Sequence, residues 1–272
     1  MAAERVATTV SQGVHGRRRV GGGETFWQFR QYQPGDPGNR IDWRQSAKSQ
    51  RVFIRETEWE AAQSVWLWRD PSGSMSYRSS SQLPTKLERA TLLLLAAASL
   101  LVRGGEYVGL LGRDRIPFTG RSALERLSEP LFGAKNDENH ADGIPKRVQI
   151  PRYARLVLIG DFLTPLEDID RLVRSYGADA IEGHMLQVLD PAEEQFPFTG
   201  RAEFHGYESE PRLLLDRVQN IRGTYLERLA AHRAGLKDIA RASGWTFASH
   251  CTDRGPETPL MALYEALSDD PR

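Results

Sequence analysis

The sequence predicts an α/β fold with a mostly parallel central sheet flanked by helices, preceded by an N-terminal extension. Residues 65–68 and 156–159 are uninterrupted apolar runs. Apolar runs without alternation are typical of parallel strands that helices cover on both faces. Strand-like segments alternate along the chain with segments of helical length, which indicates βαβ units. The chain has 272 residues, enough to bury a large core around a sheet of this kind.

The elements before the second apolar run are predicted from local patterns. Residues 1–23 are polar and predict a flexible terminus. Residues 51–60 alternate in polarity and predict an edge strand. A central strand over 65–70 precedes a helix over 83–103, whose apolar middle indicates burial. We then expect a hairpin built from 107–113 and 115–119, and a helix from 122 to 132 with a capping box.

The second half continues the same alternation. We expect strands over 155–161, 181–189 and 245–249, and helices over 165–176, 213–243 and 259–267. Residues 193–211 interrupt the pattern and predict a small β insertion, with a short hairpin over 196–204. The chain is therefore divided into residues 1–60, a tail and an extension packed on the core, and residues 61–272, the α/β domain.

Oxygen-bearing side chains follow both apolar runs. Asp70, Ser72 and Ser74 lie on a short loop after the first run, and Asp161 follows the second after one glycine. The carboxyl ends of parallel strands meet at one edge of a sheet, so these side chains should lie close together. Mg²⁺ prefers such oxygen ligands. The loop after residue 116 offers a further hydroxyl, and we choose Thr119 over Ser122. Taken alone, residues 70–74 would equally suit an ordinary turn.

These residues resemble the metal-ion-dependent adhesion site of von Willebrand factor A domains. The segment Tyr-Gln-Pro-Gly-Asp-Pro-Gly-Asn-Arg-Ile-Asp-Trp-Arg at 32–44 resembles the signature of the domain of unknown function 58 family, a bacterial branch of that fold. The resemblance covers about residues 21–267. It implies Mg²⁺ or Mn²⁺ at the site, a protein partner that presents Asp or Glu to the metal, and work with a MoxR-type AAA+ ATPase. Arg69 departs from the pattern, because an apolar residue usually precedes the metal aspartate.

The signature segment also supplies candidate partner-binding residues. They are the charged residues Asp36, Arg40, Asp42 and Arg44. Arginines beside aromatic anchors often form the centre of an interface. The alternative is that the aromatic residues of 24–60 only pack the extension onto the core.

Composition and missing motifs exclude several classes of protein. The 36 basic and 36 acidic residues cancel, which argues against a dedicated nucleic-acid binder. Cys251 is the only cysteine, so an intramolecular disulfide is impossible. The longest apolar segment, 92–102, is too short to span a bilayer. Relatives carry membrane helices before this region, as the resemblance implies, and their absence here leads us to expect a soluble, cytoplasmic protein.

Enzyme signatures are also missing from the sequence. No two histidines have the spacing of a zinc helix, and no nucleophile elbow is present. The proposed ligands include no spare general base for a metal-bound water. We therefore predict a protein-interaction module and not an enzyme. The alternatives are a metal-dependent phosphoester hydrolase, or a structural or nucleic-acid-binding scaffold that uses the basic arm at 17–19.

Overall fold

A computed structural model describes residues 2–13, 26–31, 43–48, 51–57, 64–120, 122–133, 143–206 and 212–268. The chain divides into two compact units. The first, the sheet unit, comprises Met1–Arg17 and Gln63–Arg272, and the second, the signature unit, comprises Arg18–Ala62. Among the described residues, no helix has the length and apolar character that a membrane span requires.

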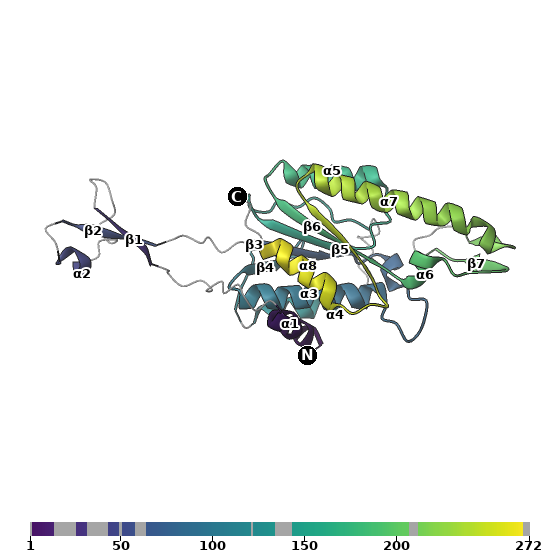
Figure 1. The fold of residues 1–272 in the computed structure, drawn as a ribbon, viewed down its shortest axis with the longest axis horizontal. Helices are drawn as coiled ribbons and strands as arrows, with labels where there is room; N and C mark the ends of the chain where they lie inside the picture. The colour runs from purple at the N-terminus through teal and green to yellow at the C-terminus, as the bar shows by residue number, and fades with distance from the viewer. Residues whose placement is uncertain are drawn as a thin grey trace. The chain divides into compact units, whose positions relative to one another are not determined.

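A five-stranded sheet forms the centre of the sheet unit, in the order β4-β3-β5-β6-β9 (Figure 1). All four strand pairings are parallel, which confirms the predicted α/β class. The strands are β3 (Ser64–Arg69), β4 (Tyr107–Leu110), β5 (Arg155–Gly160), β6 (Glu182–Leu189) and β9 (Thr246–Cys251). Chain order alternates strand and helix, as the apolar runs predicted.

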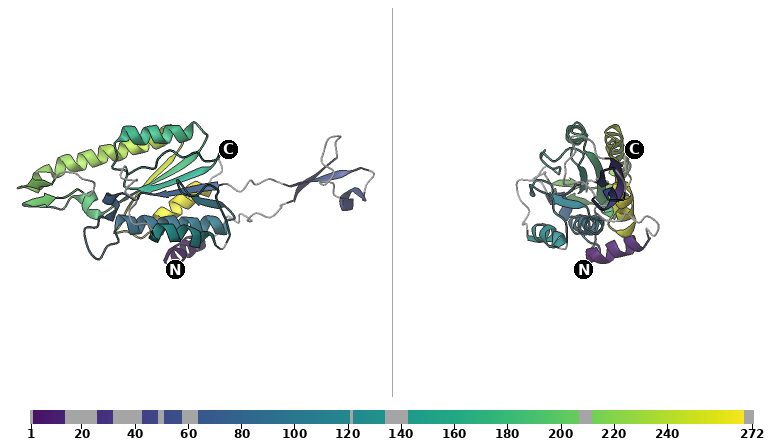
Figure 2. Two further views of the ribbon diagram at one scale, coloured as in Figure 1. Left: turned by 180° about the vertical axis from the view of Figure 1, so that it is seen from behind. Right: turned by 90° about the vertical axis from the view of Figure 1, so that its left-hand side faces the viewer.

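Helices cover both faces of this sheet (Figures 1 and 2). One face carries α1 (Ala2–Gly13), α3 (Lys86–Arg103), α4 (Ala123–Gly133) and α8 (Glu257–Ser268), and the other carries α5 (Leu166–Gly177) and α7 (Arg222–Ala242). Each face of the sheet has its own hydrophobic core. Along β3, Val65 and Leu67 belong to the core shared with α1, α3, α4 and α8, whereas Trp66 and Trp68 belong to the core shared with α5 and α7. Because both faces are buried, the strand has no polar position between its ends.

The first residues of the chain differ from the predicted flexible terminus. Ala2–Gly13 form helix α1, which packs against α3 and α8. Ala7 and Val10 are almost fully buried in the core on that face of the sheet. Small apolar residues recur here at helical spacing among polar ones, and the polar majority concealed this stripe. The expectation of a polar tail over residues 1–23 is therefore wrong for residues 2–13.

The insertion before α7 is present but is paired differently from the prediction. Helix α6 (Pro191–Gln195) leads to β7 (Ala202–Phe204), which is antiparallel to β8 (Leu213–Leu215). The 3₁₀ turn η4 (Val218–Ile221) follows, so the long helix begins at Arg222 and not at residue 213. The leucine run of β8 suits a helix and a strand equally, and the pairing with β7 decides between them.

The predicted edge hairpin is also shorter than expected. Strand β4 ends at Leu110, and the return segment contributes one antiparallel bridge, between Val108 and Phe118.

Helix α3 begins later than predicted. Its N-cap is Thr85, whose side chain forms a capping box with that of Glu88. The helix consequently begins at Lys86, three residues after the predicted start.

The signature unit contains a two-stranded antiparallel sheet and one short helix. Strand β1 (Phe26–Gln31) pairs with β2 (Phe53–Thr57), and α2 spans Trp43–Ser46. The Phe53 amide donates to the Ser46 hydroxyl at 2.9 Å, which ties the helix to β2. The strand predicted over residues 51–60 is present over Phe53–Thr57, and residues 58–60 lie outside the described residues.

Candidate metal centre

The structure brings together four of the five predicted metal ligands. Ser72 Oγ and Ser74 Oγ lie 3.1 Å apart, and Ser74 Oγ donates to Asp161 Oδ2 at 2.7 Å. The Ser72 amide donates to Asp70 Oδ1 at 2.8 Å. Asp70 and Asp161 are almost completely buried, as is Ser72. These side chains come from the carboxyl ends of β3 and β5, as the sheet rule predicted.

Backbone pairing between the two strands sets this geometry. The Asp70 amide donates to the Ile159 carbonyl at 2.8 Å, so the β3–β5 ladder extends to the first residue of the loop. Gly160 lies against the Asp70 side chain, where an added Cβ would be 2.8 Å from Asp70 Cβ. A glycine at the end of β5 is therefore required for Asp70 to occupy this place.

The loop after Asp70 is fixed by its own turns and by one anchor. Residues Gly73–Ser76 form a 3₁₀ turn, η2, and Met75 within it is fully buried.

Asp161, which follows β5, is held by two hydrogen bonds. Its Oδ1 accepts the Leu163 amide at 3.3 Å. Its backbone carbonyl accepts a hydrogen bond from Gln187 Nε2 of β6 at 3.0 Å. Both aspartates are thus held by the fold itself.

Thr119 is not brought to the other four residues. Phe118 pairs with Val108, which is opposite Val65 near the start of β3. Because this pairing is antiparallel, Thr119 continues toward the amino ends of the strands, away from Asp70 at the carboxyl edge. Its side chain is exposed, as is that of Ser122. The inclusion of Thr119 in the cluster is therefore wrong, because the hairpin turns back along β4.

Gly143 lies beside both Thr164 and Asp70. A Cβ added at Gly143 would be 2.7 Å from Thr164 Oγ1 and 3.8 Å from Asp70 Oδ2. The Thr164 hydroxyl, on the loop after β5, therefore shares Gly143 as a neighbour with Asp70, and the sequence analysis did not consider this residue. Thr164 is a hydroxyl residue only three positions after Asp161, and this spacing could have marked it as a candidate in the sequence.

Lys86 is a second residue that the sequence analysis missed. Its side chain is fully buried, and Nζ donates to Asp161 Oδ2 at 2.9 Å and to Glu193 Oε1 at 2.6 Å. Burial alone would lower the pKa of Lys86, but the charges of Asp161 and Glu193 outweigh it and raise the pKa. The ammonium therefore stays charged inside the cluster.

The donor set fits a hard divalent cation in its chemistry. It consists of carboxylate and hydroxyl oxygens, which suit Mg²⁺ or Mn²⁺ and not a soft metal. Among the residues that the structure describes, no three His, Cys, Asp or Glu side chains gather into a metal-binding group. A site here would consequently depend on the hydroxyls of Ser72 and Ser74 in addition to Asp70 and Asp161.

A cavity of about 210 Å³ adjoins Ser74. Its walls include Phe196, Phe198, Phe204 and Tyr225 from the insertion and from α7. Phe196 stacks on Tyr225 with a centroid distance of 4.5 Å. Glu193 also lines the cavity, and Lys86 holds its carboxylate. The candidate site therefore has an apolar neighbour large enough for one side chain.

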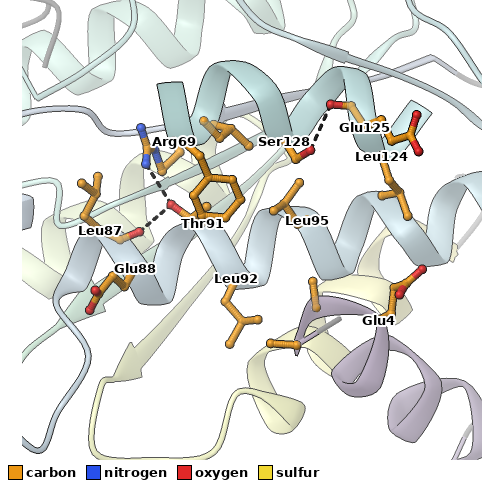
Figure 3. Close-up of a pocket in the computed structure, with 14 residues that line it drawn as sticks. Glu4, Arg69, Leu87, Glu88, Thr91, Leu92, Leu95, Leu124, Glu125 and Ser128 are labelled. Carbon is orange, nitrogen blue, oxygen red and sulfur yellow. Dashed lines mark hydrogen bonds between the residues drawn. The ribbon is translucent and has the colours of Figure 1, made fainter. Parts of the chain in front are cut away.

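A larger cavity, of about 680 Å³, lies among α1, α3 and α4 (Figure 3). Arg69 reaches it from the end of β3, and its Nη1 donates to Thr91 Oγ1 of α3 at 2.8 Å. Leu92, Leu95 and the exposed Phe132 give the cavity an apolar lining. The residue that departs from the family pattern thus contacts α3 and lies on this cavity.

The predicted partner-binding residues belong to the signature unit. Asp36, Arg40 and Asp42 lie outside the described residues. Arg44 is in α2 and is exposed, and its neighbour Trp43 is 69% exposed.

Comparison with protein families matches residues 28–235 to the model described as "Protein of unknown function DUF58". The match covers both the signature segment and the Asp-x-Ser-x-Ser loop. This chain belongs to the DUF58 family. The family resemblance seen in the sequence is thereby confirmed. Uncharacterized proteins of Mycobacterium bovis and Mycobacterium tuberculosis are 27% identical to the DUF58 chain over 250 residues, covering 86% of it and 76% of each relative.

Three solved structures also align with the DUF58 chain. An aerotolerance-related membrane protein from Bacteroides fragilis has a TM-score of 0.46 at 16% identity, covering 75% of this chain and 98% of that one. BatB from Bacteroides thetaiotaomicron has a TM-score of 0.44 at 15% identity, with 76% and 97% covered. The SpRpn10 VWA domain has a TM-score of 0.32 at 10% identity, with 75% and 95% covered.

Proposed function

We propose that this DUF58 chain is a protein-interaction module that depends on a divalent cation, Mg²⁺ or Mn²⁺. The residues that would hold the ion are Asp70, Ser72, Ser74 and Asp161. One observation carries the proposal, namely the 2.7 Å hydrogen bond from Ser74 to Asp161, which joins the ends of two strands. The oxygen side chains on the two loops therefore converge on a single place.

The chemistry of these four residues favours adhesion over hydrolysis. Mg²⁺ takes about six oxygen ligands, so four side chains leave positions for a ligand from outside. Two of the four are neutral hydroxyls, and the Asp161 carboxylate is already shared with the Lys86 ammonium, so the bound ion keeps positive charge that attracts a carboxylate. An Asp or Glu of the partner would take such a position.

The surroundings of the site support the absence of catalysis. Lys86 links the Glu193 carboxylate to Asp161, and the two Glu193 oxygens accept hydrogen bonds from Lys86 and from the Asp190 amide. A carboxylate engaged in this way is a poor general base. The alternative of a metal-dependent phosphoester hydrolase predicts turnover of aryl phosphates with Mg²⁺ or Mn²⁺, which a phosphatase assay would detect.

The aromatic cavity beside Ser74 supplies a second contact for the same partner. A side chain next to the partner's acidic residue would enter between Phe198 and Tyr225, which are both half-buried. Aromatic walls gain energy from burying such a side chain. The family resemblance suggests a MoxR-type AAA+ ATPase as the partner, working with this chain in the assembly or maturation of other proteins.

Thermal unfolding with and without metal tests the proposal. At a Mg²⁺ concentration of about 100 times the dissociation constant, ligand linkage adds about 2.7 kcal/mol, which raises Tm by roughly 5 to 10 °C. Asp70→Asn should abolish this shift, because it removes the charge while keeping the shape of the side chain. Thr119→Ala is the matched control and should keep the full shift, because Thr119 lies elsewhere.

Partner binding is measured by calorimetric titration with a MoxR-type ATPase from the same genome. Chelation with EDTA should abolish binding, and Ser72→Ala combined with Ser74→Ala should weaken it without unfolding the chain. An affinity that neither treatment changes would contradict the metal-dependent mechanism.

A further inference from the structure

A buried ion pair formed by Lys86 adjoins the candidate site. The Lys86 side chain is fully buried, and its Nζ lies between Asp161 Oδ2 and Glu193 Oε1, at 2.9 and 2.6 Å. Asp161 is 2% exposed and Glu193 is 18% exposed. A buried ammonium is tolerated only when it is paired, so these two carboxylates account for its presence.

The position of Lys86 in its helix offers no separate reason for a cation. It is the first residue of α3, directly after the cap residue Thr85. The amino end of a helix carries partial positive charge, so a lysine there is unfavourable for the helix. Lys86 is therefore explained by the carboxylates that it meets and not by the stability of α3.

The partners of Lys86 are themselves fixed by the fold. Glu193 Oε2 accepts the Asp190 amide at 2.8 Å in the capping box of α6, which leaves Oε1 for Lys86. Asp190 Oδ2 accepts the Ser79 amide at 2.9 Å, which joins α6 to the loop before α3. The ammonium consequently meets a preformed acidic pair and does not depend on a mobile surface residue.

Asp161 Oδ2 is shared between the ammonium and the candidate site. The same oxygen accepts the Ser74 hydroxyl at 2.7 Å and the Lys86 ammonium at 2.9 Å. A divalent ion among Asp70, Ser72, Ser74 and Asp161 would lie close to a fixed positive charge. Like charges at such short range repel, and the repulsion is strong where water is excluded.

We propose that Lys86 is an internal counter-cation of this site: it holds Asp161 in position without a divalent ion and weakens the affinity of the site for that ion. This inference rests on the proposed function for the location of the ion. Lys86 acts through Asp161 and is a positioning residue, not a ligand.

Lys86→Met tests both halves of the inference, because methionine keeps most of the length and removes the charge. In EDTA, the variant leaves Asp161 and Glu193 without their cation and should melt roughly 5 to 15 °C below the parent. Addition of Mg²⁺ should raise the Tm of the variant by more degrees than it raises the Tm of the parent. Calorimetric titration with MgCl₂ should show a dissociation constant at least tenfold lower than that of the parent.

Two further variants keep the test decisive. Lys86→Met with Glu193→Gln removes one of the two stranded carboxylates, so it should fold more stably while keeping the tighter Mg²⁺ binding. Lys146→Met replaces an exposed lysine and should bind Mg²⁺ as the parent does. Equal or weaker Mg²⁺ binding in both Lys86 variants would overturn the inference.

The outcomes also separate this inference from the proposed function. Mg²⁺ binding by the parent that Asp70→Asn abolishes and Lys86→Met leaves unchanged would keep the function and overturn the role of Lys86. Binding by the Lys86 variants alone would support the role of Lys86 and contradict a metal-dependent function of the parent. Absence of binding in every variant would overturn both.

Discussion

Gly160 shows how one missing side chain shapes the candidate site. A Cβ at this position would be 2.8 Å from Asp70 Cβ and 3.1 Å from Asp70 Oδ2. Gly160→Ala must therefore displace Asp70, and we expect a loss of about 1 to 3 kcal/mol in the free energy of unfolding. The rise in Tm that we propose for Mg²⁺ binding should be lost together with this stability.

Urea denaturation measures the effect of Gly160→Ala, and Gly223→Ala is its matched control. Gly223 lies in α7 and has nothing near its Cβ position, so alanine should stabilise that helix by up to about 1 kcal/mol. Equal stability of the parent and Gly160→Ala would mean that Asp70 has room to move.

His250 gives the chain a sensitivity to mild acid. It is 4% exposed, and its Nε2 lies 2.9 Å from Arg89 Nη1. An arginine can only donate, so this ring nitrogen must accept and stay unprotonated. Burial, followed by the charges of Arg89 and Arg254, lowers the pKa of His250 to about 4, and Asp253 opposes them only partly.

The lowered pKa of His250 makes the folded chain less stable as the pH falls. Between pH of about 6.5 and about 4, the unfolded chain protonates His250 and the folded chain does not, so stability falls as pH falls through this window. A pKa difference of this size corresponds to about 3 kcal/mol. His250→Gln should flatten the fall in unfolding free energy, measured by urea titration at several pH values, whereas replacing the exposed His205 should not.

At the scale of elements, α1 is a structural part of the sheet unit. Val10 is 1% exposed in the core shared with α3 and α8. Val10→Ala should therefore cost about 1 to 3 kcal/mol through lost burial and the cavity it leaves. Thr9→Ala, on the exposed side of the same helix, should change the unfolding free energy much less. Chemical denaturation of the two variants compares them directly, and equal losses would show that α1 does not contribute through its buried face.

At the scale of the whole molecule, the parallel sheet and most of its helices could be predicted from the sequence. Strands such as β3 and β5 are buried on both faces, and that burial leaves a plain apolar signal. The paired aspartates followed from the same rule, because both end a parallel strand. The sequence pattern did not predict the elements whose structure depends on contacts with distant segments. β8 is a strand because β7 is beside it, and α1 is a helix because α3 and α8 cover its narrow apolar stripe.

The site was predicted less completely than the sheet for a related reason. Thr119 was chosen from its place in the chain, but the direction of the Val108–Phe118 pairing carries it to the other end of the sheet. Lys86 looks like an ordinary helix residue in the sequence, and only its packing against Asp161 and Glu193 gives it a role. Contacts between distant segments leave no local pattern to detect.

The bond between Ser74 and Asp161 also bears on how the chain folds. The two residues are 87 positions apart, and they meet only when β3 and β5 are aligned in full register. Closing so long a loop is slow, and parallel pairings of this kind form late relative to local helices. A partly folded chain with its helices formed would therefore hold no assembled cluster. Recovery of Mg²⁺ binding during refolding would time the completion of the central sheet.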